Sequence, residues 1–180
     1  MLVLIILGLL IFFFLYFDKS FDNKLFFRYK VSRRIYMRIA IVFLISAAVM
    51  TLMIWYIDSS KLFLLIKKRP WLLLLISVFY PLFSVVPQGL AYRALFFHRY
   101  GRLFNSEIIR IIVAAAIFSL GHILYKNAFV LLLTFIGGLL FAYRYRQTNS
   151  LAVSVLEHSL LGVWLFACGL GTFFVSSMIE

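Results

Sequence analysis

Long apolar runs separated by short polar stretches dominate this sequence. Six runs are long enough, or nearly so, to cross about 30 Å of hydrocarbon as helices that rise roughly 1.5 Å per residue. They are Met1–Phe17, Ile39–Ile57, Pro70–Pro87, Ile108–Tyr125, Ala128–Tyr143 and Leu151–Ser176. The pattern predicts an all-α fold, a polytopic membrane bundle of about six transmembrane helices that forms a single membrane domain over residues 1–180.

Proline and glycine mark the expected ends and bends of these helices. Pro70 suits the first turn of the third helix, because its missing N–H is not needed there. Pro81 and Pro87 are expected to kink or end the same helix. Gly169 and Gly171 lie near the end of the last run and are expected to bend or break it.

Two further segments are expected to be interfacial rather than spanning. Gln88–Phe104 alternates apolar and basic residues at helical spacing, which predicts an amphipathic helix that continues the third span into the interface. Lys61–Arg69 is expected to be a shorter interfacial stretch. The run Met1–Phe17 has no basic residues at its start and no small-residue cleavage site before Asp18, so we expect a retained span rather than a cleaved signal peptide.

The composition agrees with a membrane protein. Hydrophobic residues make up 65% of the chain, the mean hydropathy is +1.06, and 18 basic residues against 6 acidic ones give a net charge of +12. Because the basic residues cluster between apolar runs, we interpret the charge as a topology signal and as contact with anionic lipid, not as a nucleic-acid interface. The asymmetry favours both termini outside the cytoplasm of a bacterial inner (cytoplasmic) membrane, although Lys67, Lys68 and Arg69 oppose it.

Within this apolar background stands a small set of polar residues: Gln88, Arg93, His122, Glu157 and His158. An ionisable group inside the hydrocarbon costs at least about 2.5 kcal/mol, so such residues indicate a functional site. Glu157 is the only acid within an apolar run. A histidine in an apolar helix is also often just hydrogen-bonded to the backbone, and that alternative stays open for His122.

The order of these residues resembles the CPBP family, the CAAX-prenyl-protease and bacteriocin-processing (Abi) intramembrane endopeptidases. That family carries Glu-Glu-(three residues)-Arg, then Phe-(three residues)-His, then His-(three residues)-Asn. Gln88-Gly89 with Arg93 stands at the first motif, Phe118 with His122 at the second, and His158 at the third. The resemblance covers roughly residues 78–171, so residues 70–180 are expected to form the family-like core and residues 1–69 the N-terminal spans and basic loop.

The chain departs from these motifs at several positions. Gln88 and Gly89 replace both glutamates, and Gly162 stands where the third motif has asparagine. In the family the first glutamate, assisted by the histidines, is thought to activate water, and the second pairs with the arginine. Since a glutamine cannot act as a general base, the resemblance implies an intramembrane endopeptidase homologue with reduced or absent proteolytic activity.

Glu157 is the one carboxylate that can replace the missing pair. It can act as a base toward water held by His122 and His158, or it can pair with Arg93. Adjacent helical residues point about 100° apart, so Glu157 and His158 cannot both aim straight into one site. We therefore favour the ion pair of Glu157 with Arg93.

Three functions remain open at the level of sequence. The first is an endopeptidase that cuts a peptide or lipidated protein, with Gln88 orienting water. The second is a non-catalytic membrane subunit or scaffold that binds a peptide, a lipid or a partner membrane protein. A weaker third is a proton relay through Glu157, His122 and Arg93. A divalent metal such as zinc is a further candidate, with His122 and His158 as ligands.

Overall fold

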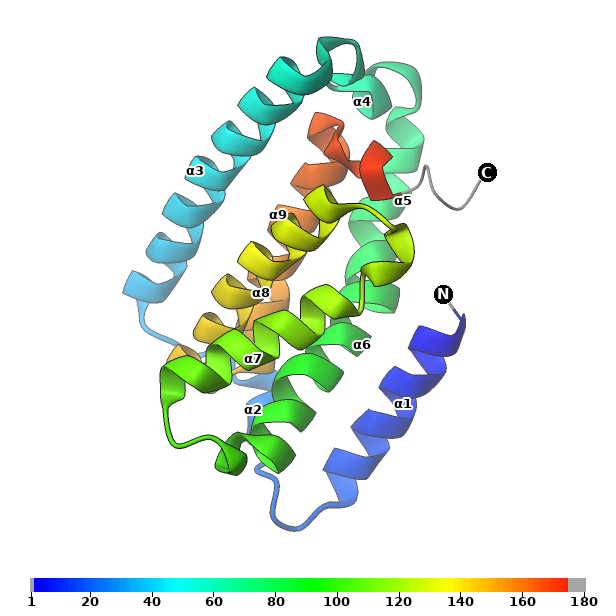
Figure 1. Ribbon diagram of the computed structural model, residues 1–180. Coiled ribbons are helices and arrows are strands. Elements are labelled where there is room, and N and C mark those ends of the chain that lie inside the picture. Colours follow the sequence, from blue (N-terminus) through cyan, green and yellow to red (C-terminus); the bar gives the residue numbers. More distant parts are fainter. Residues whose placement is uncertain (1, 175–180) are drawn as a thin grey trace.

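The computed structural model describes residues 2–174, and every regular element in that range is helical (Figure 1). The longer helices are α1 (Leu2–Phe17), α3 (Arg33–Asp58), α5 (Pro70–Tyr80), α7 (Glu107–Leu120), α8 (Ala128–Thr148) and α9 (Leu151–Cys168). The shorter turns are α2 (Lys24–Phe27), η1 (Ser59–Lys61), α4 (Leu64–Lys68), η2 (Pro81–Val85), α6 (Val86–Gly89), η3 (Leu90–Tyr100), η4 (Gly101–Leu103), η5 (Ile123–Tyr125) and η6 (Leu170–Phe174). The all-α fold expected from the sequence is confirmed.

Four helical stretches are long and apolar enough to cross a membrane. They are Arg33–Lys61, Pro70–Leu103, Ala128–Thr148 and Leu151–Cys168. Two further apolar helices are shorter, α1 with 16 residues and α7 with 14. The protein is therefore an integral membrane protein in which four helices of residues 2–174 are long and apolar enough to span the bilayer, and the count of six stays a prediction. The end of the sixth predicted span, at Ser176, lies outside the described residues.

Helix α9 lies at the centre of the bundle and contacts α3, α5 and α8. Helices α7 and α8 form an antiparallel pair in front of it (Figure 1). Helix α1 packs on the opposite side of the bundle from α3, against α6 and η3 (Figure 1). The middle of α9 is consequently enclosed, and both Glu157 and His158 are buried there.

The third span differs from the prediction. The helix does not end at its prolines but runs without a break from Pro70 to Leu103. Proline lacks an N–H, and the backbone passes Pro81 through a wide π-helical turn in which the Val86 N–H donates to the Pro81 carbonyl. A second π-helical stretch, η3, follows after the single turn α6 and contains Arg93. Such wide turns are uncommon and are often found at functional sites.

One face of the segment Gln88–Phe104 is buried within the bundle, at Leu90, Arg93, Ala94 and Phe96. The segment continues the third span, as expected, and packs against α1 and α7. Its basic residues near the C-terminal end, such as Arg102, are exposed. The interfacial position of this segment stays a prediction.

Two helix ends differ from the prediction, and a third agrees with it. Helix α3 begins at Arg33 rather than Ile39, and α8 continues to Thr148 rather than ending at Tyr143. Basic residues assigned to loops therefore lie in helices. The expected break after α9 is confirmed, because Gly169 adopts a left-handed conformation with φ of 114° and ends the helix.

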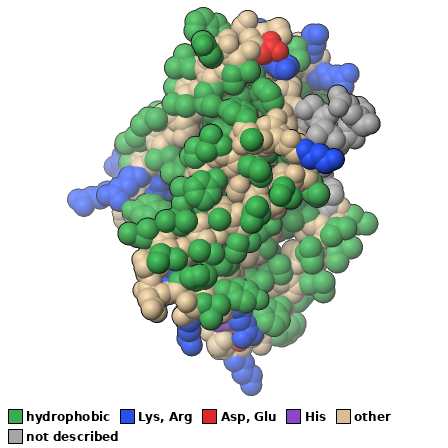
Figure 2. Space-filling view, viewed as in Figure 1, with side chains coloured by type: hydrophobic (Ala, Val, Ile, Leu, Met, Phe, Trp, Pro, Cys, Tyr) green, Lys and Arg blue, Asp and Glu red, His purple; other side chains and the backbone are tan. Residues whose placement is uncertain are grey.

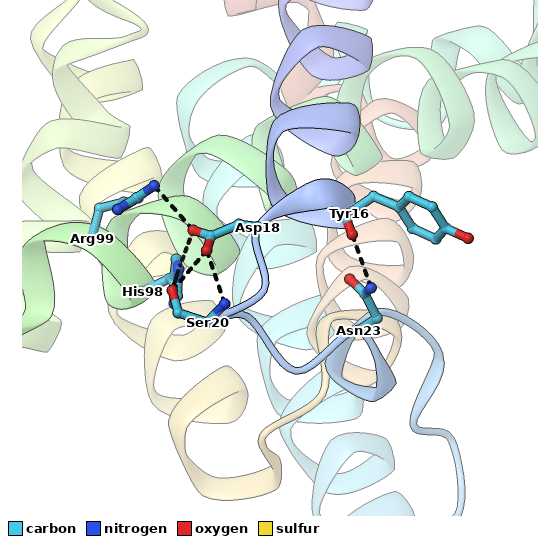
Figure 3. Close-up of polar contacts among 6 residues, drawn as sticks. All are labelled: Tyr16, Asp18, Ser20, Asn23, His98 and Arg99. Atoms are coloured by element: carbon cyan, nitrogen blue, oxygen red, sulfur yellow. Dashed lines mark hydrogen bonds and ion pairs between the residues drawn. The ribbon is translucent and has the colours of Figure 1, made fainter.

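A polar latch fastens the end of α1 to η3, as Figure 3 shows. The Asp18 carboxylate accepts hydrogen bonds from His98 Nε2 at 2.9 Å and from the Ser20 hydroxyl at 2.7 Å, and it pairs with Arg99 at 3.0 Å. The bond from His98, followed by those from Ser20, holds the pKa of Asp18 well below its usual range. His98 is mostly covered and is bonded to Asp18 at the end of α1.

The outer surface is mainly hydrophobic, with lysine and arginine gathered toward the ends of the bundle (Figure 2). Large apolar side chains stay exposed along α1, α3 and α5, among them Leu10, Leu44 and Leu74. Exposed apolar surface on this scale marks contact with another apolar phase, and a lipid bilayer supplies it. The surface agrees with the membrane location that the helix lengths indicate.

Candidate functional site

A cavity of about 320 Å³ lies between α3, α5, α8 and α9. Most of its wall is apolar, with side chains such as Met50, Leu140 and Leu165. The third span, the turn after α7 and the middle of α9 contribute polar groups to it: Tyr80, Ser84, Gln88, His122 and His158. Small-molecule sites in proteins have about this volume and this mixture of an apolar wall with a few polar groups.

The two histidines predicted to share one site do line the same cavity. His122 follows α7, and its Nδ1 lies 2.9 Å from the carbonyl oxygen of Phe118. A carbonyl only accepts hydrogen bonds, so Nδ1 carries the proton and Nε2 keeps a free lone pair. His158 is 5% exposed and its ring stacks on Phe141 with centroids 4.2 Å apart.

His158 has one partnered and one unpartnered nitrogen. Its Nε2 lies 3.4 Å from the hydroxyl oxygen of Tyr80, while its buried Nδ1 has no hydrogen-bond partner among the described residues. A buried polar nitrogen without a partner is costly in an apolar surrounding. The unpartnered nitrogen therefore indicates that something other than the side chains of residues 2–174 completes this site.

Gln88 projects from the third span toward the same cavity. Its Nε2 donates to the Ser84 hydroxyl at 2.9 Å, and its Oε1 is buried with no partner among the residues described. Gln88 lies within a continuous helix and therefore does not cap a helix end. Gly89, the second substituted position, turns the other way, because a Cβ there would meet Val155 Cγ2 at 3.0 Å and Leu151 Cδ1 at 3.1 Å.

Tyr80 is a site residue that sequence reasoning missed. It is the last residue of α5, and its ring occupies the space beside Gly162. A Cβ on Gly162 would lie 2.5 Å from Tyr80 Cε1 and 2.7 Å from its Cζ, closer than real contacts allow. The glycine therefore makes room for the phenol. The signal was present in the sequence as Gly162 at the motif's asparagine position, but it did not reveal which side chain fills the space.

Arg93 lies directly behind the cavity wall. It is 2% exposed, and its Cζ lies 4.7 Å from the Phe118 ring centroid and 5.2 Å from that of Phe141, both of which line the cavity. These are cation–π distances. Its Nη2 is buried without a hydrogen bond, and the guanidinium forms no ion pair with any residue between 2 and 174.

The predicted pairing of Glu157 with Arg93 is wrong. Glu157 forms a bidentate ion pair with Arg144 of α8, with both N–O distances at 2.9 Å and both side chains at most 5% exposed. Arg144 also donates to Gln147 Oε1 at 2.6 Å. The pairing follows from the α8–α9 hairpin, whose turn at Asn149 places both residues at a similar height. Arg144 was missed because α8 was expected to end at the residue before it.

Each acid that the structure describes has its own basic partner. The pairs are Asp18 with His98 and Arg99, Asp22 with Arg28, Asp58 with Lys61, Glu107 with Arg110 and Arg146, and Glu157 with Arg144. A proton relay through Glu157, His122 and Arg93 is therefore disfavoured, because Glu157 already pairs with Arg144. Within residues 2–174 the buried guanidinium of Arg93 has no carboxylate to offset its charge.

The side chains do not fit a catalytic zinc site. Such a site takes three protein ligands, and no group of three His, Cys, Asp or Glu side chains stands at metal-binding distance among the residues described. His122 and His158 supply two nitrogens at most, and the Glu157 carboxylate is held by Arg144. Ser119 is not a nucleophile candidate either, since its hydroxyl donates to the Leu131 carbonyl at 2.8 Å.

Comparison with known proteins gives one match. Residues 69–164 match the protein-family model described as type II CAAX prenyl endopeptidase Rce1-like. No curated protein and no solved structure matches the chain. The matched stretch contains four polar residues that line the cavity, Tyr80, Gln88, His122 and His158, and Arg93 behind its wall. Because the match covers more than half of the sequence, this chain belongs to the Rce1-like family of type II CAAX prenyl endopeptidases.

Proposed function

We propose that this protein is a member of the CAAX endopeptidase family that binds an apolar peptide or lipidated protein segment in its intramembrane cavity without hydrolysing it efficiently. Its location is the bacterial cytoplasmic membrane, where the predicted topology opens the cavity toward the cytoplasmic side. The cavity keeps the volume, the apolar wall and the two histidines of a site for such a ligand.

One observation carries the loss of activity. None of the described residues lining the cavity is an aspartate or glutamate. Gln88 occupies the position of the family's first glutamate, and Glu157 is neutralised by Arg144 at 2.9 Å. A general base needs a free lone pair on a group that can keep the proton. His122 and His158 are the remaining bases, and no carboxylate of the described residues strengthens either of them.

The test is a gain of function at Gln88. Gln88→Glu replaces an amide by a carboxylate of the same size, so it adds a base without a steric change. A prenylated fluorogenic peptide should be turned over by this variant and not by the wild-type protein, while both bind it. Gln88→Glu combined with His158→Ala is the matched control and should be inactive.

The second glutamate needs a different design. Gly89→Glu alone would press against Val155 and Leu151, whose atoms lie 3.0 and 3.1 Å from the place that a Cβ at position 89 would occupy. Its neighbour Val155 therefore has to become alanine in the same variant.

Wild-type hydrolysis that disappears in His122→Ala and His158→Ala would refute the proposed inactivity.

A further inference from the structure

The cavity wall carries hydrogen-bonding groups that nothing in the described part of the chain satisfies. Gln88 Oε1 and His158 Nδ1 are buried without partners among the described residues, and both residues line the cavity. The Tyr80 hydroxyl has only the 3.4 Å contact with His158. Buried polar groups in proteins are nearly always hydrogen-bonded, so two unsatisfied groups and one weakly bonded hydroxyl around one cavity point to a ligand.

The positive charge of Arg93 near the cavity indicates a negatively charged ligand. Arg93 is buried one ring behind Phe118 and Phe141, and no carboxylate described in residues 2–174 pairs with it. A buried, unpaired charge in an apolar interior is strongly unfavourable. The low dielectric constant there screens the charge weakly, so it acts across the wall of the cavity without direct contact.

The hydrogen-bonding groups can all act as donors to an anion. Tyr80 donates through its hydroxyl, and His158 donates through whichever ring nitrogen carries the proton. The amide of Gln88 donates through Nε2 when its oxygen accepts from Ser84, because the two amide orientations place nitrogen and oxygen interchangeably. A glutamate at position 88 would repel an anion, whereas the glutamine does not.

The apolar side chains that line the rest of the cavity indicate that the rest of the ligand is apolar. Apart from these groups, side chains such as Val49, Leu133 and Leu161 line a cavity of about 320 Å³. A purely inorganic anion would leave that apolar volume empty. A carboxylate at the end of an apolar chain matches both parts, since its oxygens accept several hydrogen bonds and its tail fills the apolar space.

We infer that the cavity binds the free carboxylate of an apolar chain, with Tyr80, Gln88 and His158 as donors and Arg93 as the compensating charge. This assignment rests on the binding role proposed above and names its ligand class. The carboxylate has two sources, a fatty acid or the free C-terminus of an apolar peptide.

The experiment compares acids with neutral analogues of the same shape. The affinities of octanoate and of its methyl ester are measured separately with the full chain in phosphatidylcholine nanodiscs, and the signal of empty nanodiscs is subtracted. The same comparison is made between acetyl-Leu-Leu-Phe as the free acid and its amide. We expect at least tenfold tighter binding of the acid in one arm or both. The arm with the larger preference identifies the source. Equal affinity of acid and neutral analogue in both arms overturns the inference.

Variants separate the role of charge from a general loss of structure. Arg93→Gln and Gln88→Glu should each reduce the preference for the acid to less than twofold. Arg102→Gln, an exposed residue beyond the same helix, removes the same charge and should leave the preference unchanged. If Arg93→Gln does not fold, Arg93→Lys and Gln88→Glu still test the inference. Arg93→Lys should keep the preference for the acid over its neutral analogue, and Gln88→Glu should abolish it.

The fatty-acid arm is independent of proteolysis. Octanoate contains no bond that a peptidase could cleave, so its binding is measured in the same way whether or not the wild-type protein hydrolyses peptides. Gln88→Glu then gives opposite results in the two tests, since it should create turnover of the prenylated peptide and abolish the preference for acids. An unchanged acid preference in Gln88→Glu overturns the inference but leaves the proposed inactivity intact.

Discussion

Breaking the ion pair between Glu157 and Arg144 by removing one partner is expected to be among the most destabilising single changes in the bundle. Both side chains are at most 5% exposed and two hydrogen bonds of 2.9 Å join them. With charge centres about 4 Å apart and an effective dielectric constant of about 20, the attraction is about 4 kcal/mol. Removing either partner leaves the other charge buried alone, which costs about 3–5 kcal/mol.

Glu157→Gln and Arg144→Gln should therefore each lower the free energy of unfolding by about 3–5 kcal/mol, and the double variant should lose far less than the sum. Unfolding of the purified protein in dodecyl maltoside micelles by increasing dodecyl sulfate measures all three. Arg146→Gln is the matched control, because Arg146 pairs with Glu107 in an exposed position and such pairs contribute about 0–1 kcal/mol.

The coupling between the two positions is the decisive quantity. A double-mutant cycle should give about 2–3 kcal/mol of interaction for Glu157 with Arg144. The same cycle for Glu157 with Arg93 should give additive effects, since those side chains form no ion pair. Additive losses in the first cycle, or an Arg144→Gln variant as stable as Arg146→Gln, would refute the reasoning.

Two further predictions concern the attachment of α1. The pKa of Asp18 is depressed in the folded protein, so its contact with His98 is complete above the ordinary aspartate pKa of about 4 and is lost as the pH falls through the lower folded-state value. Hydrogen exchange at the end of α1 should therefore rise only in that acid range. A rise between pH 7 and 5 would contradict this prediction. Gly8→Ala should destabilise the protein by about 1–3 kcal/mol, because its Cβ would lie 2.7 Å from Pro87 Cβ, whereas Gly101→Ala, with nothing within 4 Å of its Cβ, should be neutral in the same unfolding assay.

The sequence predicted the coarse fold because the membrane imposes simple rules. Apolar length indicated the spans and Gly169 indicated the end of α9, and each of these depends on a property local to one run of residues. The shared cavity of His122 and His158 was instead implied by the resemblance to the family motifs. Helix ends were less accurate, since basic residues such as Arg33 and Arg144 can belong either to a loop or to the end of a helix.

The partners within the site could not be predicted in the same way. Which arginine meets Glu157 depends on the rotation of two helices about their axes, and one additional turn at the end of α8 brought Arg144 inward. Tyr80 was hidden for a similar reason. It lies 78 residues from His158 in the sequence, and only the wide turn that begins at Pro81 sets the direction from which its ring approaches Gly162.

The partner of Glu157 and the substitutions at Gln88 and Gly89 both bear on the charge of Arg93 and therefore on function. Because Glu157 is already neutralised by Arg144, the described part of the chain has no acid to give Arg93, and Gln88 and Gly89 stand where the family motif supplies its acids. Keeping a buried guanidinium without either acid is unfavourable unless binding offsets the cost. The proposed loss of hydrolysis and the proposed binding of an anion would therefore both follow from the same substitutions, and Gln88→Glu should reverse both together.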